Sequence, residues 1–358
     1  MIWFMLPDPS HPSGGVQMQY RMVSQLNRAG IPAVVWHGRQ STRFAEPWAD
    51  APVHRALTAT LDAGDVLVMQ EVGGAKWHSL VPNIPVVKIV QGHTFLIDDP
   101  DADGLPGFPG WPNVHDALVL SDYIEDVVAL LSGPDVRVQK IPPGIDDVLF
   151  SPTPKDRVIA FMPRRRAADI AGAIRIATRA GLLPDGWSVR AIDGLDHEGV
   201  ARALSSSSIF LSGAEREGFG LPAAEAMASG CYVVGFTGDG GREYLTDDVA
   251  TVAHDNDMVL VAKAMAAAAH ALDANDPLLK AKIAQGRQLV QERYSLKAME
   301  DATVSAFRTI LAPRSPSIIR ERTLVQHYQT RAPRGGVLWS LYRAARRAGR
   351  RGVGLFGH

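Results

Sequence analysis

Two glutamates lie eight residues apart in the stretch EREGFGLPAAEAMASG, residues 215–230. A Gly-Phe-Gly turn and Pro222 separate Glu217 from Glu225, and proline suits the first turn of a helix because its missing N–H is not needed there. PAAEAMAS is good helix-forming sequence, and the apolar run SIFLS (208–212) precedes the stretch. The sequence therefore predicts a strand, then a loop with one carboxylate, then a helix with the second carboxylate in its first turn.

These groups have the chemistry of a site for a phosphate with a hydroxyl-rich group on either side. Ligands of an open parallel sheet gather outside the carboxyl ends of the strands, where a helix N-terminus offers free N–H groups and a partial positive charge. We expect the amides of Phe219, Gly220 and Leu221 to bind a diphosphate, which the turn's two glycines let approach closely. Because a carboxylate accepts hydrogen bonds, Glu225 suits a ribose and Glu217 a second sugar. The pattern predicts a nucleotide-sugar site.

Glu-x7-Glu by itself has a plainer explanation, because the helix dipole favours glutamate in a first turn whatever the function. The full string, with Gly-Phe-Gly-Leu-Pro after a strand and before a helix, is much more specific. We therefore base the functional prediction on the string and its position rather than on the two acids alone.

Short apolar runs recur along the chain and predict parallel strands in two groups. Several runs are apolar nearly throughout, as strands covered on both faces must be. Between the first two runs, residues 16–29 place apolar side chains on one helical face, which completes a βαβ unit. The runs lie at 2–6, 33–37, 66–70, 86–90, 117–121 and 136–141 in the first group, and at 157–163, 188–193, 208–212, 232–236 and 251–255 in the second.

The proline-rich segment IPPGIDDVLFSPTPKD separates the two groups and predicts a linker. A chain of 358 residues is comfortable for two domains. We predict an α/β protein with domains at 1–142 and 143–312, the second ending in a long helix at 296–312, and a basic extension at 313–358. The extension has ten arginines, no lysine and one acidic residue, whereas the net charge of the whole chain is −1.

The composition of the chain disfavours several classes of function. The near-neutral charge does not indicate a nucleic-acid partner. The single cysteine, Cys231, excludes a disulfide within the chain and indicates a reducing compartment, the cytoplasm. MIWFMLPDPS predicts a strand rather than a signal peptide, and no window approaches twenty apolar residues without a charge, so we expect no membrane-spanning helix.

The string EGFGLPAAEAMASG resembles the Glu-x7-Glu signature of retaining glycosyltransferases of the GT-B fold, in glycosyltransferase family 4. Other segments resemble the family in the expected order: PSGGVQMQYRMVSQLNRAGI its first glycine-rich loop and helix, IPPGID its interdomain segment, and SSSSIFLSGAEREGFGLP the strand before the signature. The resemblance covers most of residues 1–312. It implies two Rossmann-like domains facing a cleft, and transfer of a sugar with retained anomeric configuration from a nucleoside-diphosphate sugar held mainly by the second domain. It implies no metal ion and no cofactor.

The resemblance also implies roles for single residues. Glu217 would contact the donor sugar, Glu225 would hold the ribose, and the amides of Phe219, Gly220 and Leu221 would hold phosphate and sugar.

One segment departs from the family. Members commonly open the second domain with a glycine-arginine pair and a later lysine that neutralise the diphosphate, but here the stretch is FMPRRRAAD (161–169). Because the planar fork of arginine suits a diphosphate, we predict Arg164 first and Arg165 second as donor ligands. The alternative is that one or two of the three arginines only face water, and the sequence does not separate the role of Arg165 from that of Arg166.

The first domain contributes further candidates. HPSGGV puts Gly14 and Gly15 after a strand and before a helix, where they could approach the donor phosphate or an acceptor. VQGHTF places His93 at the end of another strand, and the family often has a histidine from this region near the reaction centre. A purely structural role is the alternative for His93, and His11 ranks below it. The predicted catalytic residues are thus Glu217, His93 and Arg164.

The acceptor class stays open between a glycan, a lipid-linked molecule and a small molecule. The tail at 331–358 mixes arginines with large apolar residues, which is typical of a segment that lies on an anionic membrane, but it could equally be disordered or pack against the acidic body. Two other functions fit the pattern: a GT-B nucleotide-sugar epimerase, and a non-catalytic GT-B-like binding protein. The base, the donor sugar and the oligomeric state are not specified.

Overall fold

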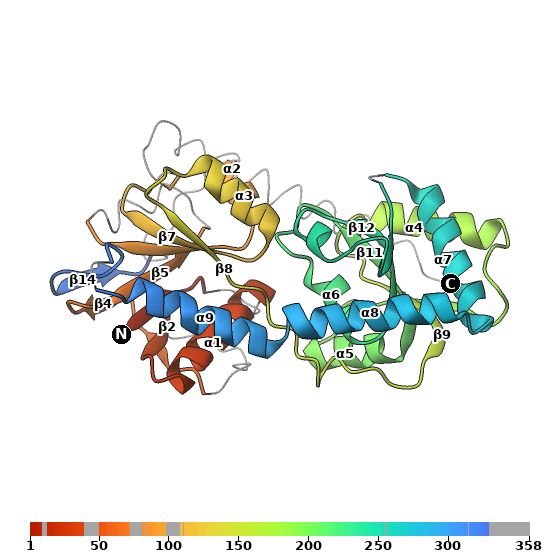
Figure 1. Cartoon of the computed structure of the whole chain (residues 1–358), viewed down its shortest axis with the longest axis horizontal. Coiled ribbons are helices and arrows are strands. Elements are labelled where there is room, and N and C mark those ends of the chain that lie inside the picture. The colour runs from red at the N-terminus through yellow and green to blue at the C-terminus, as the bar shows by residue number, and fades with distance from the viewer. Residues whose placement is uncertain are drawn as a thin grey trace.

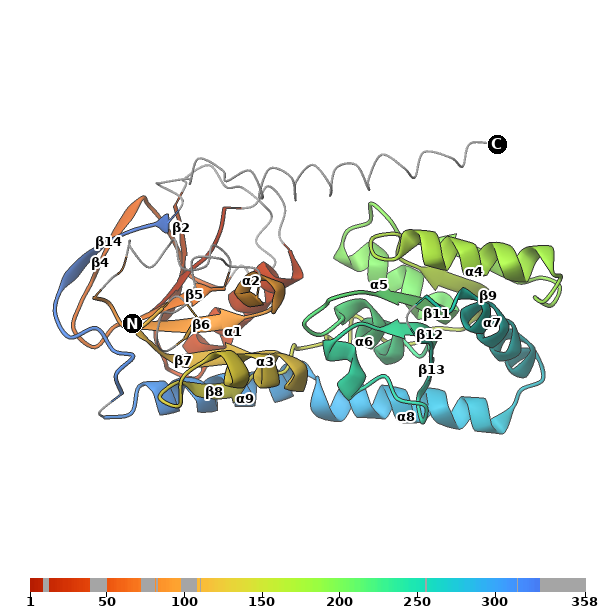
Figure 2. The same ribbon diagram turned by 90° about the horizontal axis from the view of Figure 1, so that it is seen from above.

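In the computed structural model the chain forms two α/β lobes, each built on a parallel sheet (Figures 1 and 2). The structure describes residues 1–8, 13–38, 50–71, 81, 83–97, 108–109, 111–254, 256–313 and 315–328.

The first lobe holds a sheet of seven parallel strands in the order β3-β2-β1-β5-β6-β7-β8. Its strands β2, β5 and β6 are buried along their whole length, which explains their largely apolar sequence. The strands are β1 (Ile2–Met5), β2 (Ala33–His37), β3 (Val53–Arg55), β5 (Val66–Gln70), β6 (Val86–Val90), β7 (Val114–Val119) and β8 (Arg137–Lys140). The helices are α1 (Gly14–Arg28), α2 (Thr94–Ile97) and α3 (Asp122–Leu131).

The second lobe holds five parallel strands in the order β10-β9-β11-β12-β13, covered by helices on both faces (Figure 2). The strands are β9 (Asp156–Phe161), β10 (Ser188–Ala191), β11 (Ser207–Ala214), β12 (Tyr232–Thr237) and β13 (Ala250–Val252). The helices are α4 (Ala167–Arg179), α5 (His197–Ser206), α6 (Leu221–Ala228), α7 (Met258–Asp273) and α8 (Pro277–Arg293), with a short 3-10 helix, η2 (Gly240–Glu243). Each of the eleven predicted strand segments overlaps a strand, so the predicted α/β class with two parallel sheets is confirmed.

The chain then returns to the first lobe, which the sequence does not indicate. The sequence predicts that helix α9 (Leu296–Ile310) ends the second domain, but Phe307 lies in the first core, its ring 5.6 Å from that of Phe4. Strand β14 (Thr323–Gln326), part of the predicted extension, pairs antiparallel with β4 (Thr58–Leu61). The apolar stripe of α9 predicts that one face is buried, but not which lobe covers it.

Within the described residues the chain crosses between the lobes twice, and the two crossings lie side by side. The Ile145 N–H donates to the Tyr294 carbonyl at 2.7 Å, and α8 and α9 run end to end along the same side of the molecule (Figure 1). Within the described ranges, no helix is both long and apolar enough to cross a membrane. The tail at 331–358 and His11 lie outside the described residues, so the expectations for them stay predictions.

Candidate active site

A cavity of ≈ 480 Å³ lies between the two lobes, where α1 of the first and α6 of the second both begin. It is lined by the start of α1, the loop after β6, the linker, and the second-lobe loops after β9 and β11. Two helix N-termini therefore face one cleft, which favours an anionic ligand. The cleft residues include all the predicted donor-binding residues, namely Gly14, Gly15, Arg164, Arg165, Phe219, Gly220, Leu221 and Glu225, as well as Glu217.

The first-lobe wall is organised by a cap and a glutamine. The Ser13 hydroxyl accepts from the Val16 N–H at 3.3 Å and so caps α1. The Gln91 side chain donates to the Gly15 carbonyl at 3.0 Å, and a Cβ at position 15 would lie 2.2 Å from Gln91 Oε1. Gly14 and Gly15 thus stand at the cleft, and their role in donor binding stays a prediction.

On the second-lobe side of the cleft, a buried tyrosine holds the Gly-Phe-Gly turn in place. The Tyr244 hydroxyl donates to the carbonyls of Phe219 at 3.2 Å and Gly220 at 2.6 Å, and the Phe219 ring packs 4.8 Å from the Tyr244 ring. In a trans peptide the N–H points opposite to the C=O. The N–H groups of Gly220 and Leu221 therefore point away from buried Tyr244, on residues that line the cleft. Gly220 has φ = 88°, a left-handed conformation that favours glycine.

Glu217 lies in the loop between β11 and α6, beside two arginines. Its Oε1 is 3.4 Å from Arg165 Nε, and its side chain is 22% exposed. Burial raises the pKa of Glu217 above its usual value, while Arg165 and Arg164 act in the opposite direction. The predicted sugar-contacting carboxylate and the predicted diphosphate cations thus form one cluster.

Glu225 lies in the first turns of α6 and has a cation from each lobe near it. Burial raises the pKa of Glu225 to about 7, and Arg21 of α1 and Arg164 of the second lobe partly oppose this effect. Near neutral pH, the fraction of Glu225 that is ionised therefore depends on these two arginines.

The structure separates the three arginines. Arg164 and Arg165 are exposed to the cleft, which they line. Arg166 has φ = 41° and its guanidinium lies 4.8 Å from the Phe236 ring centre and 3.4 Å from Asp169. Arg166 therefore fixes the start of α4, whereas the first two arginines are available to a ligand.

His93 does not line the cavity. It is 5% exposed, its Nε2 lies 3.4 Å from Asp239 of the second lobe, and its ring packs edge-on at 5.0 Å from Tyr123. This position joins the two lobes beside the cleft, so the structural alternative has support and a catalytic role for His93 stays a prediction.

The lobes touch closely beside the cavity. A Cβ at Gly218 would lie 2.1 Å from the backbone oxygen of Gln91, across the interface. The Glu243 carboxylate accepts from the Asp122 N–H at 2.7 Å, which joins η2 to the start of α3. From the sequence, both glycines of the Gly-Phe-Gly turn are expected to let a ligand approach the backbone. In the structure, the lack of a side chain at Gly218 also lets the first lobe pack closely against the second.

Sequence reasoning missed three titratable residues that line the cleft: Arg21 of α1, Asp146 of the linker and His197 of α5. Burial lowers the pKa of His197, and Arg21 lowers it further, while Asp146 and Asp196 act in the opposite direction. The spacing of Gln17 and Arg21, one turn apart after the glycines, could have indicated a polar stripe on α1. Nothing in the sequence joins that stripe to the linker or to α5.

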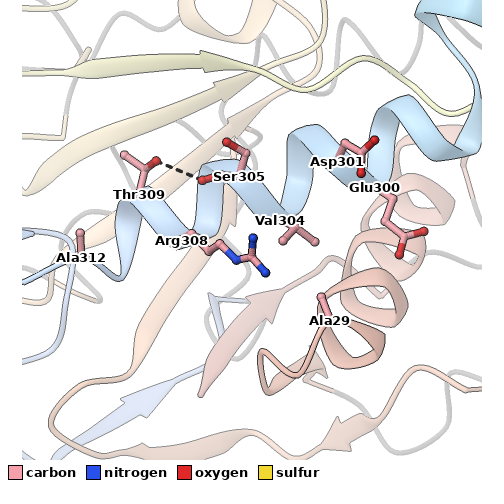
Figure 3. Close-up of a pocket in the computed structure, with 8 residues that line it drawn as sticks. All are labelled: Ala29, Glu300, Asp301, Val304, Ser305, Arg308, Thr309 and Ala312. Carbon is pink, nitrogen blue, oxygen red and sulfur yellow. Dashed lines mark hydrogen bonds between the residues drawn. The ribbon is translucent and has the colours of Figure 1, made fainter.

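A second hollow, of ≈ 660 Å³, lies on the outer surface of the first lobe, between the end of α1 and α9 (Figure 3). The hollow is wide and open, and its contacts are of the kind found along any exposed helix, such as the Thr309 hydroxyl donating to the Ser305 carbonyl at 3.0 Å. It has no helix N-terminus and none of the predicted site residues, so we assign no function to it.

Comparison with known proteins gives a family match that includes part of the cleft. Residues 186–280, which include Glu217 and Glu225, match the family model described as glycosyl transferases group 1. The matched range lies within the second lobe, from just before β10 to the start of α8. The chain is also similar to an alpha-1,6-glucosyltransferase of Actinobacillus pleuropneumoniae, with 33% identity over 178 residues. That match covers 48% of this chain and about half, 52%, of the relative.

Solved structures match the fold over most of the chain. A glycosyltransferase from Rickettsia africae matches with a TM-score of 0.63 at 14% identity, over 87% of this chain and 98% of the other. A sucrose-phosphate synthase from Thermosynechococcus elongatus matches with a TM-score of 0.63 at 15% identity, over 87% and 99%. Anabaena HepE, solved with UDP, matches with a TM-score of 0.61 at 12% identity, over 86% and 99%. The chain therefore has the GT-B fold that its sequence pattern predicted.

Proposed function

We propose that this protein is a retaining glycosyltransferase that transfers a sugar from a nucleoside-diphosphate sugar to an acceptor. The observation that carries the proposal is the cleft, which brings Glu217, Glu225, two arginines and two helix N-termini to one cavity. These groups match the parts of a nucleotide sugar: carboxylates for hydroxyl groups, and amides and cations for a diphosphate. The group 1 match and the similarity to a glucosyltransferase support the same function.

In the proposed complex, the second lobe holds the donor. Glu225 accepts hydrogen bonds from the ribose hydroxyls, and the amides of Gly220 and Leu221 bind the diphosphate. Arg164 and Arg165 neutralise the diphosphate, and Glu217 faces the sugar. UDP is the first nucleotide to test, because Anabaena HepE was solved with UDP and with UDP-glucose.

The main contribution of the protein to the rate is then electrostatic. As the bond between the sugar and the diphosphate breaks, negative charge grows on the leaving oxygen, and preorganised arginines and amides stabilise it. Removing one such donor typically costs about 3–4 kcal/mol. We do not assign Glu217 as a nucleophile. With two arginines at the diphosphate, we expect turnover without an added metal ion.

The acceptor is a glycan, a lipid-linked molecule or a small molecule, and we propose that the protein works in the cytoplasm. Among these acceptors, a lipid-linked one at the cytoplasmic face of a membrane would agree with the basic and apolar tail at 331–358.

A thermal-shift screen over nucleoside diphosphates and their sugars tests the proposal. A ligand at 100 times its Kd adds about 2.7 kcal/mol to the free energy of unfolding, so both the base and the sugar would be visible. Sugar transfer to an acceptor, insensitive to EDTA, is the expected activity. Conversion of the sugar nucleotide without any acceptor would instead indicate an epimerase. If no nucleoside diphosphate stabilises the protein, the proposed function is wrong.

A further inference from the structure

Arg21 is a cation that the first lobe places in a cleft whose other arginines belong to the second lobe. It lies on α1, two turns beyond the glycine pair. The starts of α1 and α6 are in contact, since a Cβ at Gly14 would lie 3.0 Å from Leu221 Cδ1. Glu225 lies one turn into α6. Arg21 and Glu225 both line the cleft, and the charge of each affects the pKa of the other.

The guanidinium of Arg21 is held by a hydrogen bond to the linker. Its Nη1 donates to the Gly144 carbonyl at 2.5 Å, which ties α1 to the crossing between the lobes. Burial lowers the pKa of Arg21, and the negative charges of Asp146 and Glu225 act in the opposite direction. The guanidinium remains a cation, because arginine is not deprotonated in proteins.

The charges around Glu225 come from several elements. Arg21 of α1 and Arg164 from the loop after β9 are the two that favour its charged form. Among the described residues, the other titratable side chains that line the same cavity are Asp146 of the linker, His197 of α5, Arg165 after β9 and Glu217 before α6. Arg21 is thus the cation that reaches Glu225 from the opposite lobe.

We propose that Arg21 is a positioning residue: held by the Gly144 carbonyl, it keeps the Glu225 side chain a carboxylate that accepts hydrogen bonds from the donor ribose. The inference rests on the proposed function. A neutral carboxyl has one oxygen that donates, so it pairs less well with two hydroxyl groups, which are themselves donors. Ribose binding by the second lobe therefore depends on a residue of the first lobe.

The proposal predicts a specific pH dependence of donor binding. Glu225 must be charged to bind, so affinity falls as the pH drops through its pKa. Removing Arg21 raises that pKa, so in Arg21→Met the loss of affinity begins at a higher pH. If the pKa rises by about 1, binding weakens about tenfold at a pH below both pKa values. We expect Arg21→Met to bind UDP about tenfold more weakly than wild type at pH 6.5 and nearly as well at pH 8.5.

Isothermal titration calorimetry with UDP, repeated in buffers of different ionisation enthalpy, measures the affinity and the protons released on binding. Arg21→Met should release more protons than wild type at pH 7, because Glu225 starts neutral and must lose its proton. Arg21→Lys, which keeps the charge, should stay close to the wild-type profile. The matched control is Arg28→Met on the same helix, since Arg28 lies outside the cleft, 3.4 Å from Asp50.

Glu225→Gln distinguishes positioning from a purely structural role. In that background, adding Arg21→Met should change neither the pH profile nor the proton release. A pH-independent loss of affinity in Arg21→Met, or the same loss in both backgrounds, overturns the inference, as does an unchanged pH profile. If wild-type protein binds no nucleoside diphosphate at all, the proposed function fails instead, which is a separate outcome.

Discussion

Gly218→Ala tests whether the two lobes must close as tightly as the structure shows. Gly218 does not have a positive φ, so alanine suits its backbone and the added methyl group is the whole perturbation. That Cβ would lie 2.1 Å from the Gln91 backbone oxygen, whereas ordinary contacts begin at 3.4 Å. The lobes would have to separate locally by about 1.3 Å, and neither partner is a flexible side chain that could move aside.

A displacement of about 1 Å between reacting groups can cost on the order of 100-fold in rate. We therefore expect kcat/KM of Gly218→Ala to fall about 100-fold in a sugar-transfer assay. The affinity for the nucleoside diphosphate should change less, because the second lobe supplies most of the proposed donor contacts. Small-angle scattering of the variant with UDP should report a more open form than wild type.

Gly92→Ala is the matched control for this substitution. Gly92 lies in the same first-lobe loop as Gln91, but a Cβ there would meet its nearest atom, Glu71 Oε1, at an ordinary 3.7 Å. It should keep near-normal turnover. Wild-type kcat/KM in Gly218→Ala would refute the reasoning, because close contact of the lobes would then not matter for catalysis.

Further substitutions test the cleft and the fold. Arg165→Met removes a cation that lowers the pKa of Glu217, so that pKa should rise and the acid limb of the pH–rate profile should move to higher pH; an unmoved limb counts against the pairing. His93→Ala should lower kcat with little change in UDP affinity if the contact with Asp239 orders the closed cleft, whereas unchanged kcat would make His93 dispensable. Phe307→Ala should lower the free energy of unfolding by about 3–5 kcal/mol in a urea titration, because Phe307 is buried in the first-lobe core, and a loss below about 1 kcal/mol would contradict that packing.

The local structure around the signature could be predicted from the sequence, because it depends on neighbouring residues. Apolar runs of strand length marked the parallel strands, and Pro222 marked the start of α6. Glu217 and Glu225 then had to lie on either side of that helix start. The same reasoning missed the short strands β3, β4 and β14.

What only the tertiary structure decided was which surfaces meet. The apolar face of α9 required a partner, but only the fold shows that the partner is the first-lobe core around Phe4. Arg21 and Glu225 are separated by some two hundred residues, and no local pattern specifies that α1 and α6 begin at one cleft. The sequence by itself thus determined two parallel sheets and the donor-binding signature. Long-range packing, which periodicity and spacing do not encode, decided the rest. It brings the two lobes into contact, places Arg164 and Arg165 apart from Arg166, and puts Arg21 in the same cleft as Glu225.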